Sequence, residues 1–210
     1  MALKPKAKQE KVETKYKSHV EAQVVLKDEN NTQDERVEAL EYLIETQDIS
    51  HILKLANLLF AQNKIEDHIY IDMVFGSFYG KTKSDEDYNN LTISLQSINV
   101  YLRNAAITYL QNSDEEAAIF IEKLLQSKNK DIRIFAINIL GDVKYEKSVD
   151  MLRYFLAQED DVNAMMTAVD YLGEIGSQED IPLLKTLKVA HKDDPYVMFG
   201  VDMAIDRIKG

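Results

Sequence analysis

Asp85, Asp87 and Asn89 are the residues whose types and spacing come nearest to a metal site. Oxygen ligands at the first, third and fifth positions of a loop are typical of calcium binding. Such a loop also needs a glycine at position six for its sharp turn and a glutamate at position twelve that binds through both oxygens. Here those positions hold Asn90 and Gln96. The segment is therefore predicted to cap a helix rather than to bind calcium.

Other kinds of site lack the residues that they need. The chain of 210 residues has no cysteine, which excludes disulfides, zinc–thiolate sites and cysteine nucleophiles. It has no glycine-rich phosphate loop, and no spacing supports a serine–histidine or paired-carboxylate centre. We therefore expect no catalytic residue, no bound metal and no cofactor.

The charge is distributed unevenly along the chain. Residues 1–17 hold six lysines against Glu10 and Glu13, a net of +4, so the remainder carries −15 of the total of −11. The segment 1–17 is expected to be a flexible basic arm, and 18–210 the folded part. Such an arm could contact nucleic acid, a membrane surface or an acidic partner, or fold onto its own acidic body. The acidic body itself argues against a nucleic-acid groove.

The first residues also bear on localisation. No apolar run follows the N-terminal lysines, so a secretory signal is not expected. No stretch approaches the length of a membrane span. A cytoplasmic protein is the expectation.

A repeated phrase indicates the helices that must position any functional residue. It reads N-V-Y-L-R-N-A-A-I-T-Y-L at 99–110, N-K-D-I-R-I-F-A-I-N-I-L-G at 129–141 and D-D-V-N-A-M-M-T-A-V-D-Y-L-G at 160–173. Aligning the alanine of each A-[IV] pair places Ala106, Ala136 and Ala168 30 and 32 residues apart, with a weaker copy at Ala204. A period of this size indicates a repeat array, in which each unit buries its apolar face only against its neighbours.

Each repeat is predicted to hold two helices, A and B, because a second set of apolar segments precedes the repeated phrases. Short polar turns such as 127–131 are typical of neighbouring antiparallel helices. The expected fold is an all-α, right-handed superhelix (solenoid) of five to six helical hairpins, clearest over 85–176. Segment 16–28 is either the first helix or a strand. Gly141 and Gly173 are expected at left-handed turns near helix ends.

The phrase [ND]-x-x-[LI]-R-x-x-A-I-x-x-L, preceded by a helix with an I-P-L-L run, resembles the HEAT-repeat superfamily. The period is shorter than the roughly 40–47 residues of long HEAT units and is similar to that of phycobilisome-lyase-type HEAT-like repeats. The resemblance covers roughly 33–210 and is strongest over 99–176. Arg103 and Arg133 keep the repeat arginine, whereas Met166 and Gly200 replace it. A ladder of acid–arginine contacts between repeats is therefore expected only in the middle of the array.

The resemblance implies a curved docking surface for another protein. The enzymes of the superfamily can be compared residue by residue. Iron hydroxylases of this type use histidine–glutamate pairs, but here the residues that follow the histidines are Val20, Ile52, Ile69 and Lys192. HEAT-like DNA glycosylases rely on tryptophans and a basic groove, and this chain has no tryptophan.

Two alternatives to a protein-binding scaffold are kept. The first is a bilin-lyase-like or chaperone subunit that handles a cofactor or a client protein, since bilin-lyase subunits share the repeat type. The second is nucleic-acid binding through the lysine-rich arm.

Helix geometry predicts the partner-facing residues. Each helical residue advances by about 100°, so positions two before and two after the core alanines point away from the core. These positions are Asn104, Thr108, Ile134, Asn138, Met166, Asp170, Asp202 and Asp206. In a solenoid of this type they line the concave surface.

The same positions indicate the chemistry of the partner. Asp170, Asp202 and Asp206 would concentrate negative potential and favour a basic partner segment. Exposed Ile134 and Met166 would add apolar anchors. The other interpretation is a merely solvated face with chance apolar members.

Overall fold

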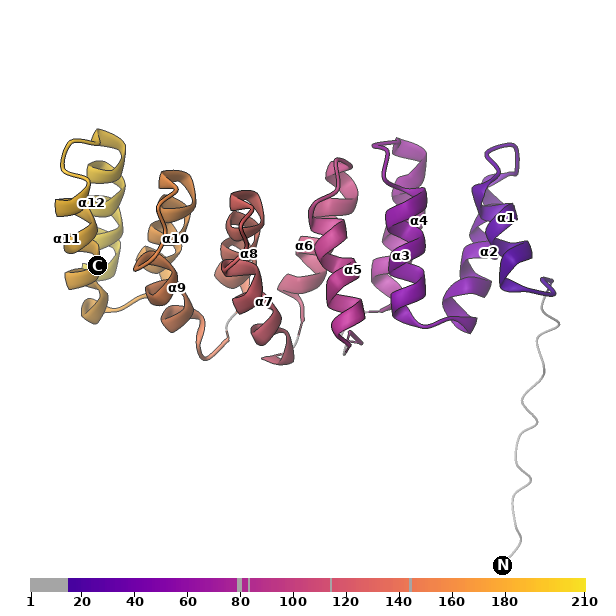
Figure 1. The fold of residues 1–210 in the computed structure, drawn as a ribbon, viewed down its shortest axis with the longest axis horizontal. Helices are drawn as coiled ribbons and strands as arrows, with labels where there is room; N and C mark the ends of the chain where they lie inside the picture. The colour runs from indigo at the N-terminus through magenta and orange to yellow at the C-terminus, as the bar shows by residue number, and fades with distance from the viewer. Residues whose placement is uncertain (1–14, 79–80, 83, 114, 144) are drawn as a thin grey trace, which may run out of the picture.

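The computed structural model describes residues 15–78, 81–82, 84–113, 115–143 and 145–210, and over these it holds helices and connecting turns without a strand. Six helical hairpins follow one another in a single elongated row (Figure 1). Their helices, in pairs, are α1 (His19–Lys27) and α2 (Gln33–Thr46), α3 (Ile49–Leu59) and α4 (His68–Ser77), α5 (Asp85–Leu95) and α6 (Val100–Gln111), α7 (Ala118–Leu125) and α8 (Lys130–Asp142), α9 (Ser148–Leu156) and α10 (Val162–Ile175), α11 (Ile181–Ala190) and α12 (Pro195–Lys209). The predicted all-α array is confirmed, and the segment that could have been a strand is helix α1.

Helix α5 begins at the acidic segment that resembled a calcium loop. The Ser84 side chain accepts a hydrogen bond from the backbone N–H of Asp87, and the Asp87 carboxylate accepts one from the backbone N–H of Ser84. This reciprocal pair is a capping box. Asp87 also accepts a hydrogen bond of 2.5 Å from the Ser50 hydroxyl in the preceding hairpin. The segment therefore caps a helix, as predicted, and also joins two repeats.

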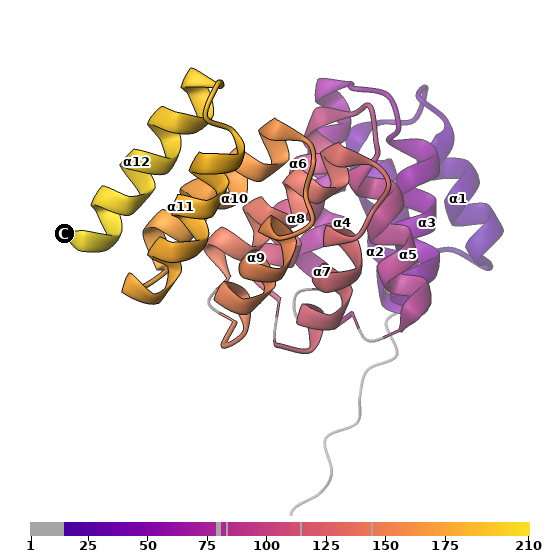
Figure 2. The ribbon, with the colours of Figure 1, turned by 60° about the vertical axis from the view of Figure 1, so that its left-hand side comes forward.

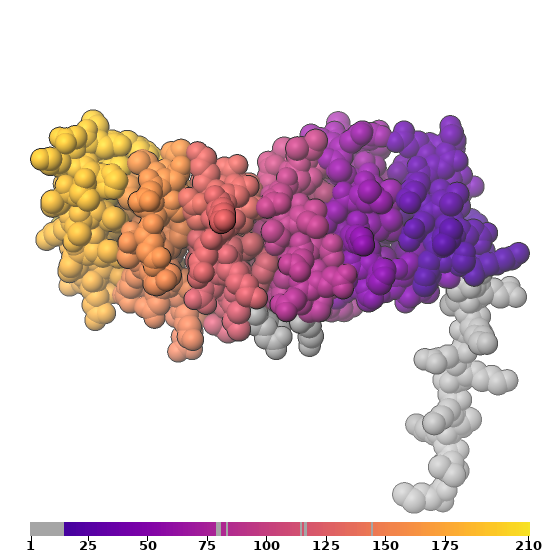
Figure 3. Space-filling view, viewed as in Figure 1, coloured from indigo at the N-terminus to yellow at the C-terminus, as the bar shows by residue number. Residues whose placement is uncertain are grey.

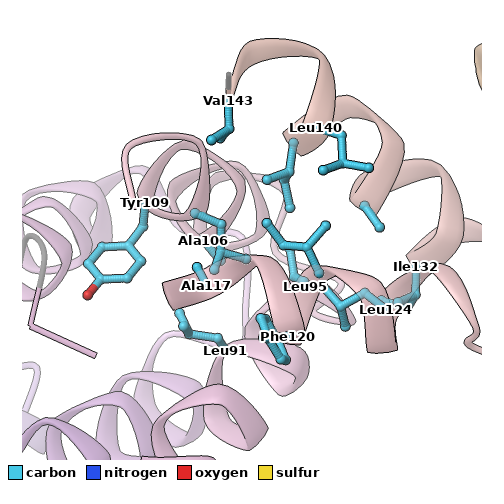
Figure 4. Packing of buried hydrophobic residues seen from close by; sticks show 14 of the residues in the cluster. Leu91, Leu95, Ala106, Tyr109, Ala117, Phe120, Leu124, Ile132, Leu140 and Val143 are labelled. Atoms are coloured by element: carbon cyan, nitrogen blue, oxygen red, sulfur yellow. The ribbon is translucent and has the colours of Figure 1, made fainter. Parts of the chain in front are cut away.

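The repeated alanines lie at the centre of the core. Ala106, Ala136 and Ala168 are completely buried, and Ala204 is 1% exposed. In the close view of Figure 4, Ala106 lies among side chains of its own hairpin, such as Leu95, and of the next one, such as Leu140. A side chain this small lets the helices on either side approach closely, because any larger group would separate them.

Two glycines extend this close packing between B helices. A Cβ atom added to Gly173 of α10 would lie 2.9 Å from both the Cα and the Cβ atom of Ala204 in α12. One added to Gly141 of α8 would lie 1.8 Å from the ring of Tyr171. Among the described residues only Gly210 has a positive φ. The expectation of left-handed turns at Gly141 and Gly173 is therefore wrong, because both serve close helix–helix contact.

The two layers of the array are packed unequally. Consecutive B helices (α2, α4, α6, α8, α10, α12) pack on one another at every junction, whereas among consecutive A helices only α3 and α5 pack as closely. The turned view of Figure 2 shows the two layers side by side along the row. In the C-terminal half the B helices thus lie closer together than the A helices, which supports a concave B side and opens space between A helices.

Arginine–carboxylate pairs between hairpins are more widespread than expected. Arg133 of α8 binds Glu159 before α10, at 2.6 and 2.7 Å. Beyond this middle region, Arg153 of α9 donates to Asp180 at 2.5 Å, and Arg207 of α12 donates to Asp170 of α10 at 2.6 Å. The ladder therefore continues to the C-terminal hairpin through arginines that the repeated phrase does not contain.

The described chain begins inside the predicted arm. The side chain of Tyr16 is 6% exposed, its ring lies 5.5 Å from that of Tyr42, and its hydroxyl donates to the Glu35 carbonyl. Lys15 forms a 2.5 Å ion pair with Glu38 of α2. The folded part therefore includes residues 15–17 and does not begin at residue 18. The rest of the predicted arm, 1–14, lies outside the described residues.

Candidate protein-binding surface

Most of the residues predicted to meet a partner are exposed on the B helices. Asn104 and Thr108 of α6, Asp170 of α10, and Asp202 and Asp206 of α12 are exposed, and Asn138 of α8 is half-buried. They lie on the consecutive B helices α6, α8, α10 and α12, and Asp202 is within reach of Lys188 on the A helix α11. We call this surface the B-helix face.

Met166 does not belong to this surface. Its side chain is 5% exposed, and its terminal methyl lies 2.3 Å from where a Cβ of Gly200 would be. Because Gly200 has no side chain, α12 leaves room there for Met166 of α10. Ile134 is half-buried against the core. The prediction that Met166 and Ile134 are exposed apolar anchors is therefore wrong for Met166, and Ile134 offers only part of its side chain.

The three aspartates of the B-helix face each have a cation beside them. Arg207 binds Asp170 at 2.6 Å, Lys188 binds Asp202 at 2.5 Å, and Lys209 lies 3.8 Å from Asp206. The negative potential predicted from the aspartates is therefore largely offset locally. Exposed ion pairs of this kind contribute little to stability because water and salt screen them, so a partner can replace them at little cost.

An apolar row lies on the last B helix. Tyr196, Phe199 and Met203 of α12 are 57%, 68% and 42% exposed. Their spacing of three and four residues places them on one helix face, and Asp206 continues that line. Sequence reasoning missed them because it read only the positions two before and two after each alanine. The signal was present in the spacing of large apolar residues in 196–203.

A hollow of about 410 Å³ opens between the B helices α4 and α6. Asp72, Phe75 and Gly76 line it from α4, and Tyr101, Asn104 and Thr108 line it from α6. Two predicted residues thus border a defined depression. The α4 side was missed because α4 lacks the repeated phrase. Phe75 is buried, whereas Gly76 is exposed.

A larger groove of about 940 Å³ lies on the opposite side, between the A helices α7 and α9. Leu125 and Phe155 line its apolar part. Most of its charges are already paired within the chain, because Arg133 binds Glu159, Asp150 binds Arg153 and Asp161 binds Lys130. Burial raises the pKa of Glu159, but the hydrogen bonds from Arg133 and from the backbone N–H of Asp161 outweigh it and leave the pKa below its usual value. The groove is thus largely satisfied by internal contacts.

The described residues offer no other kind of site. No group of three or more histidine and carboxylate side chains among them could hold a metal ion. None of the described helices is both long and apolar enough to cross a membrane. Figure 3 shows the continuous surface that the six hairpins present from one side.

Comparison with known proteins agrees with this geometry. A family model described as HEAT repeats matches residues 117–199, which cover the hairpins α7–α8 and α9–α10, helix α11 and the start of α12. No curated protein matches the chain. The match concerns HEAT repeats in general, and likeness to the phycobilisome-lyase type stays a prediction. Residues 117–199 therefore consist of HEAT repeats, and the same hairpin architecture continues upstream of them.

Proposed function

We propose that this protein is a non-catalytic scaffold that binds another protein across the B-helix face. Arrays of helical repeats present extended surfaces of this kind, and HEAT repeats generally mediate protein–protein interaction. The observation that carries the proposal is the apolar row Tyr196, Phe199 and Met203, exposed beside the polar residues of the same face.

The energetics of burial favour a protein partner at this row. Single exposed apolar side chains are normal on protein surfaces. Three on one helix face form a strip that water solvates poorly, and such strips mark interaction sites. Aromatic side chains that become fully buried supply much of the affinity of protein interfaces. An amphipathic helix of a partner would place its own apolar residues against this spacing.

The polar residues of the face would form the rim. Asn104, Thr108 and Asn138 present amides and a hydroxyl that can exchange water for partner hydrogen bonds. Around an apolar centre, such contacts fix orientation and exclude water more than they add affinity.

The proposal is tested by comparing the parent with the double variant Phe199→Lys and Met203→Lys. Partners are captured from extracts of cells that make the protein, identified by mass spectrometry, purified and titrated against both proteins by calorimetry. Both side chains are exposed, so the melting temperature should change little. Loss of apolar anchors should weaken binding by at least about tenfold, the effect of roughly 1.4 kcal/mol.

A matched control is available on other surfaces. Ile98 and Ile119 are 82% and 67% exposed, and Ile119 lies on the A helix α7. The variant Ile98→Lys with Ile119→Lys adds the same charge and should bind the partner as the parent does. If the α12 variant also binds like the parent, the row on α12 is not part of the binding surface.

A further inference from the structure

The hollow between α4 and α6 has the form of a socket for one side chain. It exists because Gly76 presents no side chain, and a Cβ added there would meet nothing within 4 Å. Its inner wall includes the rings of Phe75 and Tyr109, which are 7% and 4% exposed and meet edge to face with centroids 5.9 Å apart. A volume of about 410 Å³ suits one long side chain with part of its backbone.

A fixed carboxylate stands at the rim of this socket. The hydroxyl of Tyr101 lies 2.9 Å from both carboxylate oxygens of Asp72. The ring of His68 stacks on that of Tyr101, with centroids 3.6 Å apart and planes 7° apart, so Tyr101 is itself held in place. Among the described residues no lysine or arginine forms an ion pair with Asp72, unlike the aspartates elsewhere on the B-helix face.

The acceptor capacity of Asp72 is only partly used. An ionised carboxylate offers about four lone-pair positions, and a single hydroxyl can donate only one hydrogen. The carboxylate can therefore accept further hydrogen bonds from a ligand that enters the hollow. The hydrogen bond with Asp72 raises the pKa of Tyr101, so its hydroxyl keeps the proton that it donates to Asp72.

The combination of an aromatic wall and a fixed carboxylate selects among side chains. A guanidinium group is planar, donates two parallel hydrogen bonds to a carboxylate and stacks on aromatic rings. A lysine ammonium is a compact charge that cannot form this fork. A purely apolar side chain would shield Asp72 from water and leave its remaining lone pairs without a donor, which is costly. Asn104 and Thr108 add oxygen acceptors for the remaining N–H groups.

We infer that the hollow between α4 and α6 binds an arginine side chain carried by a segment of the partner protein. The inference rests on the proposed function, because the hollow opens on the B-helix face. Charge complementarity supports it further, since the net charge of −11 speeds the approach of a basic segment at low salt.

The experiment uses the full chain labelled with ¹⁵N and the capped peptide acetyl-Ala-Arg-Ala-amide. Two further peptides replace arginine by lysine or by citrulline, which has the same shape without the charge. Titration should shift the amide signals of Gly76, Tyr101 and Asn104 in a saturable way with the arginine peptide. The lysine peptide should bind at least about fivefold more weakly, and the citrulline peptide should give no saturable shift.

Variants locate the site. Asp72→Asn keeps the shape of the rim but removes the charge, and should weaken binding of the arginine peptide by at least about tenfold. Gly76→Leu fills the hollow and should abolish its binding. Glu122→Gln, an exposed carboxylate in the α7–α9 groove, should change nothing. Each variant's own ¹⁵N spectrum establishes that the array is folded.

The outcomes separate this inference from the proposed function. It is overturned if the arginine peptide gives no saturable shift, or if Asp72→Asn binds it as the parent does. In either case the scaffold proposal still stands provided that the Phe199 and Met203 variant loses the purified partner. The arginine peptide could bind while the purified partner binds the α12 variant as tightly as the parent. That result would support the socket and contradict the wider proposal.

Discussion

At the scale of single residues, Asp180 is a buried carboxylate among the arginine–carboxylate pairs that join neighbouring hairpins. Its carboxylate has no exposed surface, and it accepts hydrogen bonds from Arg153 Nε at 2.5 Å and from the Ser177 backbone N–H at 2.8 Å. Burial raises the pKa of Asp180, but the hydrogen bonds from Arg153 and Ser177 outweigh it. The pKa therefore lies below its ordinary value of about 3.9.

This shift predicts how the free energy of unfolding depends on pH. A carboxyl with a lowered pKa in the folded state binds protons more readily when unfolded, so its contribution is present above pH about 4. That contribution is lost as the pH falls through the folded-state pKa. Asp180→Asn should lower the free energy of unfolding by about 1–3 kcal/mol at neutral pH. Urea unfolding between pH 7 and about 3 should also show a flatter acid limb for the variant.

Asp206→Asn is the control for this measurement, since Asp206 is exposed and its nearest cation is 3.8 Å away. It should leave the unfolding curve nearly unchanged at every pH. The role assigned to the Arg153–Asp180 pair predicts that the free energy of unfolding falls more steeply with acid in the parent than in Asp180→Asn. Equal slopes for the two proteins would contradict that role.

At the scale of helices, the distance between neighbouring B helices depends on glycine. Gly173→Ala would place a methyl group 2.9 Å from the backbone of Ala204, and the helix α12 must shift to admit it. The gain in helix propensity, up to about 1 kcal/mol, is smaller than the usual cost of overpacking, about 1–3 kcal/mol. We expect a lower free energy of unfolding in chemical denaturation.

Gly76→Ala is the matched substitution in another B helix. Nothing lies within 4 Å of the added methyl, so only the helix propensity should change. That variant should gain about 0.5–1 kcal/mol. Opposite signs for the two variants are the expected result. Equal effects would show that helix propensity, and not contact between α10 and α12, governs both positions.

The difference between features within one hairpin and contacts between hairpins explains what could be predicted from the sequence. Periodicity and capping residues act within one hairpin, so the helices and the buried alanines were predictable. Whether Met166 is exposed depends on Gly200, which lies 34 positions further on in the next hairpin. Gly200 belongs to the weaker copy of the repeated phrase, so the pattern did not align the two residues. The socket likewise needs Gly76 and Asp72 to face Tyr101 across two hairpins. A pattern within one helix contains no information about such pairs.

At the scale of the whole molecule, the hairpins are joined with unequal strength. In a repeat array, the free energy of unfolding is approximately the sum of each unit's intrinsic stability and the energies of its interfaces with its neighbours. Helices α8, α10 and α12 pack closely on one another, and their residues Ala136, Ala168 and Ala204 are buried. The first hairpin is joined less extensively, because α1 packs on α2 and only α2 makes substantial contact with the second hairpin.

A single arginine supplies much of the polar contact at this first junction. Arg36 of α2 lies over the ring of Tyr70 at 4.5 Å and 3.7 Å from the buried carboxylate of Asp67. Its Nε also donates to the carbonyl of Leu26 at 3.0 Å, which connects it to the end of α1. Replacing Arg36 should therefore loosen the first hairpin from the second and α1 from α2 together.

Hydrogen exchange followed by mass spectrometry can measure this gradient directly. In the parent protein, amides of α1 and α2 should exchange faster than those of α8 and α10, because local opening there breaks fewer contacts. Arg36→Met should speed exchange in α1 and α2 by at least about tenfold while α8 and α10 keep their rates. Uniform acceleration along all six hairpins would mean that the array unfolds as one cooperative unit and that the first junction is as strong as the last.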